Sequence, residues 1–161
     1  MKYDHFLQDN IFKPFEMHNS GHNPESIGYV EINGERQSVP PISNPTILIG
    51  NGDLCSSVED LYRWDQALHT GKIVSKKSLE AIFFPHVFMV GSTTRSHGYG
   101  WFKDEQLNKK VIEYSGALRG FLSKYIRFID DQVTIILLTN LENQDQFSQM
   151  WNDFAAIIAD Q

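Results

Sequence analysis

Two β-rich runs joined by a pair of aspartates decide the fold: FLSKYIRF at residues 121–128 and VTIILLT at residues 133–139. Aromatic and β-branched residues such as these favour strands. Asp130 and Asp131 between the runs are typical turn residues, so we predict that the two strands form a hairpin. The second run is apolar at positions on both faces of a strand, and both faces are therefore expected to be covered.

One cover for this strand comes from the end of the chain. Apolar residues recur there at helical spacing, which predicts an amphipathic helix packed on one face of the sheet. They are Phe147, Met150, Trp151, Phe154 and Ile158. Two β-rich runs before the hairpin, residues 99–102 and 111–114, are expected to add further strands.

Upstream of the strands, the pattern favours helices. Apolar residues at helical spacing predict a helix over residues 3–12 that ends ahead of Pro14. Ser57 is a good N-cap for a helix that continues to Leu68, and Gly71 supplies the left-handed residue that ends it. A shorter helix is expected from Ser75 to Ile82. We expect these mid-chain helices to lie towards the second face of the sheet.

Residues 18–44 are irregular and rich in glycine and proline, apart from a short strand at 28–32 that turns at Asn33-Gly34. We interpret this stretch as a surface excursion packed on the domain, because it lacks the repetition of a linker. The 161 residues are therefore expected to form a single domain, residues 1–161. Its predicted class is α+β, with an antiparallel sheet flanked by helices.

Composition excludes several function classes. The net charge is −6 and lysines and arginines are scattered, so nucleic acid is not an expected partner. The longest apolar run, residues 133–138, is too short to cross a bilayer. His18 and His22 stand four apart, but glycine between them argues against a helix, and no metal or other cofactor is expected. Cys55 is interpreted as a small buried hydrophobe.

Five stretches of the chain, taken in order, carry a resemblance to a known family. They are FLQDNIFKPFEM at residues 6–17, GNGDLCSSVEDL at 50–61, HGYGW at 97–101, YSGALRGF at 114–121 and LLTN at 137–140. Together they resemble the C-terminal half of the serine β-lactamase superfamily. This class C-type group includes penicillin-binding proteins, D-alanyl-D-alanine peptidases and related esterases. The resemblance implies a partial β-lactamase/transpeptidase-like fold.

The resemblance also implies acyl transfer through an activated serine. In this superfamily a Ser-x-x-Lys motif supplies the nucleophile, and a Tyr-x-Asn or Ser-x-Asn motif assists proton movement. Neither motif occurs in this sequence. Both precede, in the family, the stretch with which this chain begins. The chain is therefore expected to be the C-terminal portion of such a domain, without the segment that carries the nucleophile.

The third family motif, usually Lys or His, then Ser or Thr, then Gly, corresponds to Tyr114, Ser115 and Gly116. By resemblance these three residues bind the substrate, and the backbone N–H of Ala117 is one oxyanion donor. Tyr114 departs from the family pattern, because a phenol offers a hydrogen bond but no cation. An ester or amide without a carboxylate therefore fits this site better than a β-lactam.

The sequence thus predicts a segment of a serine hydrolase for ester, amide or β-lactam substrates that is inactive alone. The alternatives are a non-catalytic module that binds peptidoglycan or another partner through the same groove, and a stable fragment without a function of its own. Expected partners are a small-molecule or cell-wall peptide substrate, and either the missing N-terminal segment or a second copy of the chain. The sequence does not indicate the cellular compartment, although family members are often extracytoplasmic.

Overall fold

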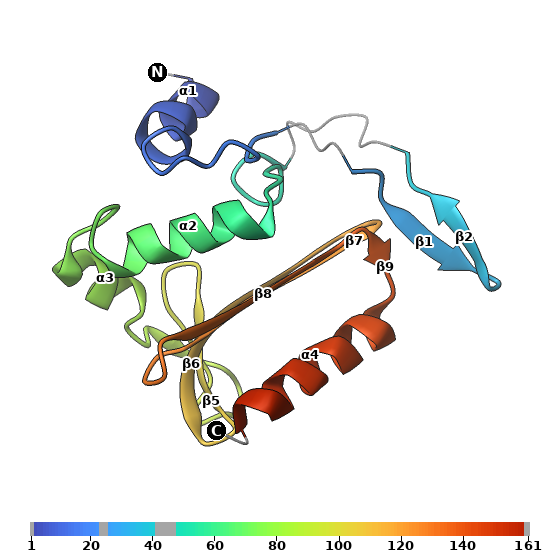
Figure 1. The fold of residues 1–161 in the computed structure, drawn as a ribbon. Helices are drawn as coiled ribbons and strands as arrows, with labels where there is room; N and C mark the ends of the chain where they lie inside the picture. Colours follow the sequence, from blue (N-terminus) through green and yellow to red (C-terminus); the bar gives the residue numbers. More distant parts are fainter. Residues whose placement is uncertain (1, 23–25, 41–47, 160–161) are drawn as a thin grey trace.

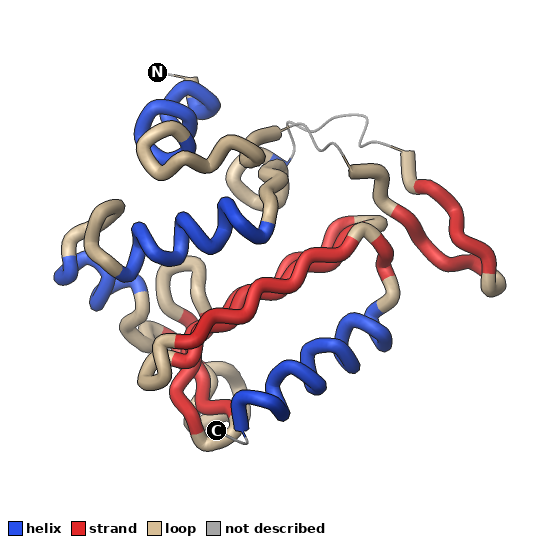
Figure 2. The backbone as a smooth tube through the Cα atoms, in the orientation of Figure 1, coloured by secondary structure: helices blue, strands red, loops and turns tan. Residues whose placement is uncertain are grey.

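The computed structural model describes residues 2–22, 26–40 and 48–159. Its main feature is a six-stranded antiparallel sheet with the strand order β3-β4-β5-β6-β7-β8 (Figures 1 and 2). The strands are β3 (Val87–Phe88), β4 (Ser96–His97), β5 (Phe102–Gln106), β6 (Lys109–Leu118), β7 (Phe121–Phe128) and β8 (Val133–Thr139). The helices are α1 (Tyr3–Leu7), the π-helix η1 (Gln8–Phe12), α2 (Val58–His69), α3 (Lys76–Ile82) and α4 (Gln144–Ala159). The predicted α+β class and antiparallel sheet are confirmed.

The hairpin of β7 and β8 forms with the predicted bounds, and its register pairs Phe128 with Val133 and Leu122 with Thr139. Gln132 after the two aspartates has a φ of 58°, which closes the turn. The predicted helix over residues 3–12 is present as α1 followed by η1. Ser57 caps α2 by accepting the N–H of Asp60, and Gly71 after the helix has a φ of 76°. These elements depend on local chemistry, so the sequence predicted them well.

The strand predicted over residues 99–102 is wrong. Residues 98–101 form a turn in which the N–H of Gly98 donates to the carbonyl of Trp101 at 2.8 Å. Gly100 has a φ of 76°, a left-handed conformation that a strand residue does not adopt. The strand β5 therefore begins only at Phe102, where pairing with β6 starts.

A second, three-stranded sheet was not anticipated. It has the order β2-β1-β9, from β1 (Tyr29–Ile32), β2 (Glu35–Ser38) and β9 (Leu141–Glu142), and β9 pairs with β1 in parallel. The glycine-rich excursion thus pairs, through β1, with the residues just after β8. Gly28 and Gly120 allow this approach: a Cβ on Gly28 would lie 2.5 Å from the ring of Phe121. Residues 23–25 and 41–47 of the excursion lie outside the described part of the chain.

Helices cover both faces of the sheet, as predicted (Figure 1). On one face α4 packs through Ile158 against Val111, Ile126 and Phe128, and through Phe147 against Leu122 and Leu137. On the other face lies α2. The predicted stripe on α4 is only partly buried, since Met150 and Phe154 are 46% and 44% exposed. Among the described helices, none is both long and apolar enough to span a bilayer.

A fully buried carboxylate, Asp65, joins α2 to the sheet. It accepts a hydrogen bond from the hydroxyl of Tyr125 on β7. Arg127 Nη1 lies 2.8 Å from Asp65 Oδ2, and Thr134 Oγ1 on β8 lies 3.2 Å from Oδ1. Burial and the hydrogen bond to Asp65 raise the pKa of Tyr125 above its usual value. The network thus fixes α2 on two neighbouring strands.

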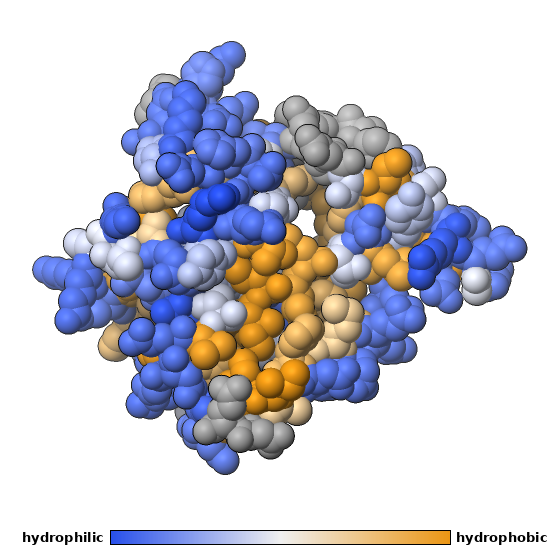
Figure 3. Space-filling model, in the orientation of Figure 1, coloured by the Kyte–Doolittle hydropathy of each residue, from blue (hydrophilic) through white to orange (hydrophobic). Residues whose placement is uncertain are grey.

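β8 is the last strand of the larger sheet and pairs only with β7 among the described strands. The backbone groups on its outer side form an open edge. Hydrophobic side chains gather between α2 and α4, where β8 lies (Figure 3). The residues that contribute exposed apolar surface on β8 and α4 are Val133, Leu138, Met150, Phe154 and Ile157. An open edge beside exposed apolar surface favours association.

The Asp65 network leads to a first prediction. Asp65→Ala leaves the largely buried Arg127, whose side chain is 11% exposed, without its carboxylate, so the free energy of unfolding should fall by about 3–5 kcal/mol. Urea denaturation followed by circular dichroism measures this change. Asp9→Ala is the matched control, because Asp9 pairs with Lys13 on the surface and its loss should leave the transition in place. An equal, small effect of the two substitutions would contradict the role given to Asp65.

The unpaired outer side of β8 leads to a second prediction. The chain should form a dimer or a higher oligomer at micromolar concentration, since β8 has backbone groups available for another strand. Sedimentation velocity across a concentration series measures this. Leu138→Lys places a charge on the exposed face of β8 and should shift the distribution towards monomer, whereas Val90→Lys at a distant exposed position should not. A monomer at every concentration would disprove the prediction.

Candidate substrate-binding edge

The third-motif residues lie where β6 loses one of its two neighbours. Residues 109–113 of β6 pair with β5, and the register ends at Phe102 opposite Glu113. From Tyr114 to Leu118, β6 pairs only with β7 among the described strands. This segment is exposed, so alternate backbone N–H and C=O groups are available on its outer side. We call residues 114–118 the open edge.

Strand alternation divides the open edge between the two faces of the sheet. Ser115 pairs with Lys124 and Ala117 pairs with Leu122, which packs against α4. Ser115 and Ala117 therefore belong to the face that α4 covers. Gly116 pairs with Ser123, and a Cβ on Gly116 would lie 2.6 Å from Ser123 Oγ. A side chain at this position would therefore meet the Ser123 hydroxyl unless Ser123 changed its rotamer.

Tyr114 belongs to the opposite face from Ser115. Its side chain is 46% exposed, and its ring stacks on that of Phe102 with 5.9 Å between centroids. The structure thus places Tyr114, Ser115, Gly116 and Ala117 together on one exposed segment. The side chains of Tyr114 and Ser115 lie on different faces of the sheet.

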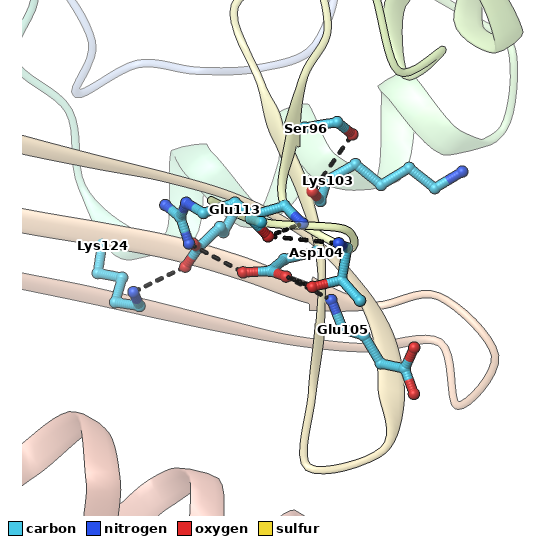
Figure 4. A network of polar contacts seen from close by, with 9 residues as sticks. Ser96, Lys103, Asp104, Glu105, Glu113 and Lys124 are labelled. Atoms are coloured by element: carbon cyan, nitrogen blue, oxygen red, sulfur yellow. Dashed lines mark hydrogen bonds and ion pairs between the residues drawn. The ribbon is translucent and has the colours of Figure 1, made fainter. Parts of the chain in front are cut away.

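A buried ion network supports the start of the open edge (Figure 4). Glu113 is 2% exposed, and its two carboxylate oxygens have different cations as partners. Arg95 Nη1 lies 2.5 Å from Glu113 Oε1, and Lys124 Nζ lies 2.8 Å from Oε2. Arg95 also pairs with Asp104 at 3.0 Å. The network joins the residue just before β4 to β5, β6 and β7 at the point where β5 pairing ends.

Burial alone would raise the pKa of Glu113, but the hydrogen bonds and charges of Lys124 and Arg95 lower it below its usual value. The carboxylate is thus held in its charged form. Our sequence reasoning missed this residue. The available indication was a glutamate directly after Val111-Ile112, since a charge in a buried strand needs a partner.

A pocket of about 180 Å³ lies between the open edge and α4. Its polar lining comes from Ser115 on β6, Ser123 and Lys124 on β7, and Gln144 and Ser148 on α4. Trp151 forms part of its apolar wall. Lys124 Nζ lies 4.8 Å from the centroid of the Trp151 ring. The pocket therefore has one cation and several hydrogen-bond donors beside an aromatic surface.

The remaining polar residues of interest have structural partners. His22 lies between Asp4 and Asp53 at 2.9 and 3.0 Å, and no group of three metal-ligating side chains occurs in the described ranges. Asp60, in the first turn of α2, is fully buried and accepts the N–H of Asn19 at 2.7 Å. Burial and Asp53 raise the pKa of the Cys55 thiol, which disfavours a reactive thiolate.

Comparison with curated proteins identifies relatives that are longer than this chain. The chain is 31% identical over 168 residues to Penicillin-binding protein 4* of Bacillus subtilis (strain 168), covering 92% of this chain and 37% of that protein. It is 24% identical over 140 residues to a D-aminopeptidase of Brucella ovis, covering 84% of this chain and 27% of the relative. The chain thus spans about a third of the length of these relatives.

The fold is also that of a solved penicillin-binding protein. The structure from Bacillus halodurans superposes with a TM-score of 0.79 at 18% identity, covering 99% of this chain and 50% of that chain. The model of the family described as Beta-lactamase matches residues 1–160. Since this match covers nearly the whole sequence, the chain belongs to the Beta-lactamase family of serine hydrolases.

Proposed function

We propose that this chain supplies the substrate-binding part of an acyl-transfer site that acts on amide or ester bonds. The open edge at residues 114–118 is the observation that supports the proposal. An extended acyl substrate can add to such an edge as a further strand, with its backbone hydrogen-bonded to β6. β6 pairs with β7 along the whole of this segment, so the edge is held in position before the substrate arrives.

The chemistry proposed for the edge is stabilisation of a developing negative charge. When a serine oxygen attacks the substrate carbonyl, the carbonyl oxygen becomes an oxyanion, and the proposed donor to this oxyanion is the N–H of Ala117. The serine is not provided by a Ser-x-x-Lys motif of this sequence. We therefore propose that a preceding segment carries the nucleophile and that the 161 residues alone do not catalyse the reaction.

The proposed substrate is an amide or peptide, with an ester as a further possibility. The names of the relatives, a penicillin-binding protein and a D-aminopeptidase, support this class. Tyr114 presents a phenol and no cation on its face of β6, so the part of the substrate beside Tyr114 is expected to be uncharged.

A second candidate is a non-catalytic module that binds a cell-wall peptide at the same edge. The lack of both upstream motifs in this sequence favours it. Under this hypothesis the open edge binds the peptide backbone and no covalent bond forms.

The activity prediction compares this chain with a completed domain. The chain alone should hydrolyse neither p-nitrophenyl acetate nor a chromogenic cephalosporin above background. Fusion of the upstream part of Penicillin-binding protein 4* to its N-terminus should restore labelling by a fluorophosphonate probe, detected by in-gel fluorescence. Gly116→Ala in the fusion should lower the labelling rate at least about tenfold, because the added Cβ lies 2.6 Å from Ser123 Oγ and the edge or that side chain must move from its present geometry.

Gly21→Ala is the matched control, since a Cβ on Gly21 meets no atom within 4 Å. Its labelling rate should equal that of the parent fusion. A folded fusion that is never acylated but binds peptidoglycan would exclude the hydrolase and support the binding module. A saturable rate in the chain alone that disappears with Ser115→Ala would make Ser115 a nucleophile and overturn the proposal.

A further inference from the structure

Positive charge is concentrated in one segment of this chain, residues 66–103, which we call the basic segment. It contains a single acidic residue, Glu80, although the whole chain has 20 aspartates and glutamates. Its lysines and arginines are Lys72, Lys76, Lys77, Arg95 and Lys103. The basic segment therefore has a net charge of +4, whereas the net charge of the whole chain is −6. Such an asymmetry gives the protein one region that attracts anions and a remainder that repels them.

The four lysines of the basic segment keep their charge uncompensated. Arg95 is neutralised by Glu113 and Asp104. None of the lysines forms an ion pair within the part of the chain that the structure describes. Lys76 and Lys77 are exposed in the first turn of α3. The segment thus stays positive at its surface.

The same segment presents exposed apolar side chains on the hairpin of β3 and β4. At its tip Val90 is fully exposed, with a larger exposed fraction than any other large hydrophobic residue of the described ranges. The exposed apolar residues of the hairpin and its base are Phe84, Val87, Phe88, Met89, Val90 and Tyr99. We call these six residues the hairpin patch. Exposed apolar residues gathered in this way mark a surface that binds a partner.

Hydrogen bonds within the hairpin hold its tip in a projecting conformation. The N–H of Met89 donates to the carbonyl of Arg95 at 2.9 Å, and the N–H of Ser92 donates to the carbonyl of Met89 at 3.0 Å. Ser92 Oγ accepts the N–H of Arg95 at 2.8 Å. Gly91 has a φ of 79°, which allows the chain to reverse directly after Val90. The tip is therefore an ordered convex turn.

α3 joins the exposed lysines to the hairpin patch. The N–H of Tyr99 in the patch donates to the carbonyl of Ile82, the last residue of α3, at 2.9 Å. Because α3 has only seven residues, Lys76 and Lys77 lie about 10 Å along the helix from this contact. The lysines and the apolar residues thus belong to one connected unit.

We propose that the hairpin patch and the lysines of the basic segment bind an anionic lipid surface. A projecting turn with adjacent aliphatic and aromatic residues can insert between lipid headgroups. Lysines beside it are attracted to anionic lipids, and the negative remainder of the chain turns away from the surface. A soluble anionic polymer would need only the lysines, and a second copy of the chain would need only the patch. No residue of the open edge takes part, so the proposal is independent of the acyl-transfer function.

Binding to vesicles provides the first measurement. The chain should bind vesicles of equal parts POPC and POPG at least about tenfold more tightly than POPC vesicles, because each lysine near the surface gains from the anionic headgroups. Co-sedimentation with sucrose-loaded vesicles gives both partition coefficients. Binding to the mixed vesicles should weaken as NaCl rises from about 0.05 to about 0.5 M, since salt screens the attraction.

Charge variants test the lysines. Lys76→Gln combined with Lys77→Gln should lower the partition coefficient on mixed vesicles at least about tenfold. Lys109→Gln combined with Lys110→Gln is the matched control, because it changes the net charge equally but lies on β6, outside the basic segment. The control should bind as the parent chain does.

Apolar variants test the tip. Phe88→Ser combined with Val90→Ser should lower the partition coefficient at least about tenfold, because two side chains no longer leave water on binding. Met150→Ser combined with Phe154→Ser is the matched control, since it removes two exposed apolar residues from α4. Its partition coefficient should equal that of the parent chain.

A fluorescent label reports insertion without removing either set of residues. An NBD group on Val90→Cys, in a Cys55→Ser background, should gain intensity and shift to shorter wavelength on mixed vesicles, because the tip enters the bilayer. The same label on Met150→Cys should change little.

Absence of binding to the mixed vesicles would overturn the proposal, as would equal losses in a test pair and its control. Binding that needs the lysines but leaves the Val90 label in water would indicate an anionic polymer and contradict lipid insertion. A shift towards monomer with Phe88→Ser and Val90→Ser, at unchanged vesicle binding, would instead make the hairpin patch an interface between copies.

Discussion

The buried carboxylate of Asp65 is the interaction on which the arrangement of this molecule depends. It comes from α2, whereas its partners Tyr125, Arg127 and Thr134 come from β7 and β8. A charge without water must be neutralised by groups in fixed positions, so α2 can occupy only one place over the sheet. The second face of β7 and β8 is covered through this contact, while α4 covers the first through apolar packing.

Because helices cover both faces of the sheet, β7 is a rigid neighbour for β6. The open edge of β6 is therefore ordered although β5 does not pair with it. Tyr114–Leu118 has no β5 partner, yet it pairs with β7 along its whole length. The Glu113 network holds the position at which β5 pairing ends. Strand edges that bind ligands need this combination of free backbone groups and firm support.

The two faces of the open edge have different electrostatic character. Tyr114 lies on one face with an aromatic partner, and Ser115 lies on the other with a cation beside it. Lys124 on the second face is itself paired with the buried carboxylate of Glu113 at 2.8 Å.

The sequence by itself determined the elements whose causes are local. The hairpin strands within residues 121–139, the Ser57 cap and the Gly71 terminus depend on neighbouring residues, and the structure confirms them. Only the tertiary structure decided which distant residues meet. The parallel pairing of β9 with β1, the turn at residues 98–101 in place of a strand, and the pairing of Asp65 with Arg127 and of Glu113 with Arg95 were not predicted. The physical reason is that the spacing of apolar residues along the chain indicates only the face of a helix or strand on which each residue lies. A buried charge or an additional strand is stabilised by partners tens of residues away, and the spacing does not identify those partners.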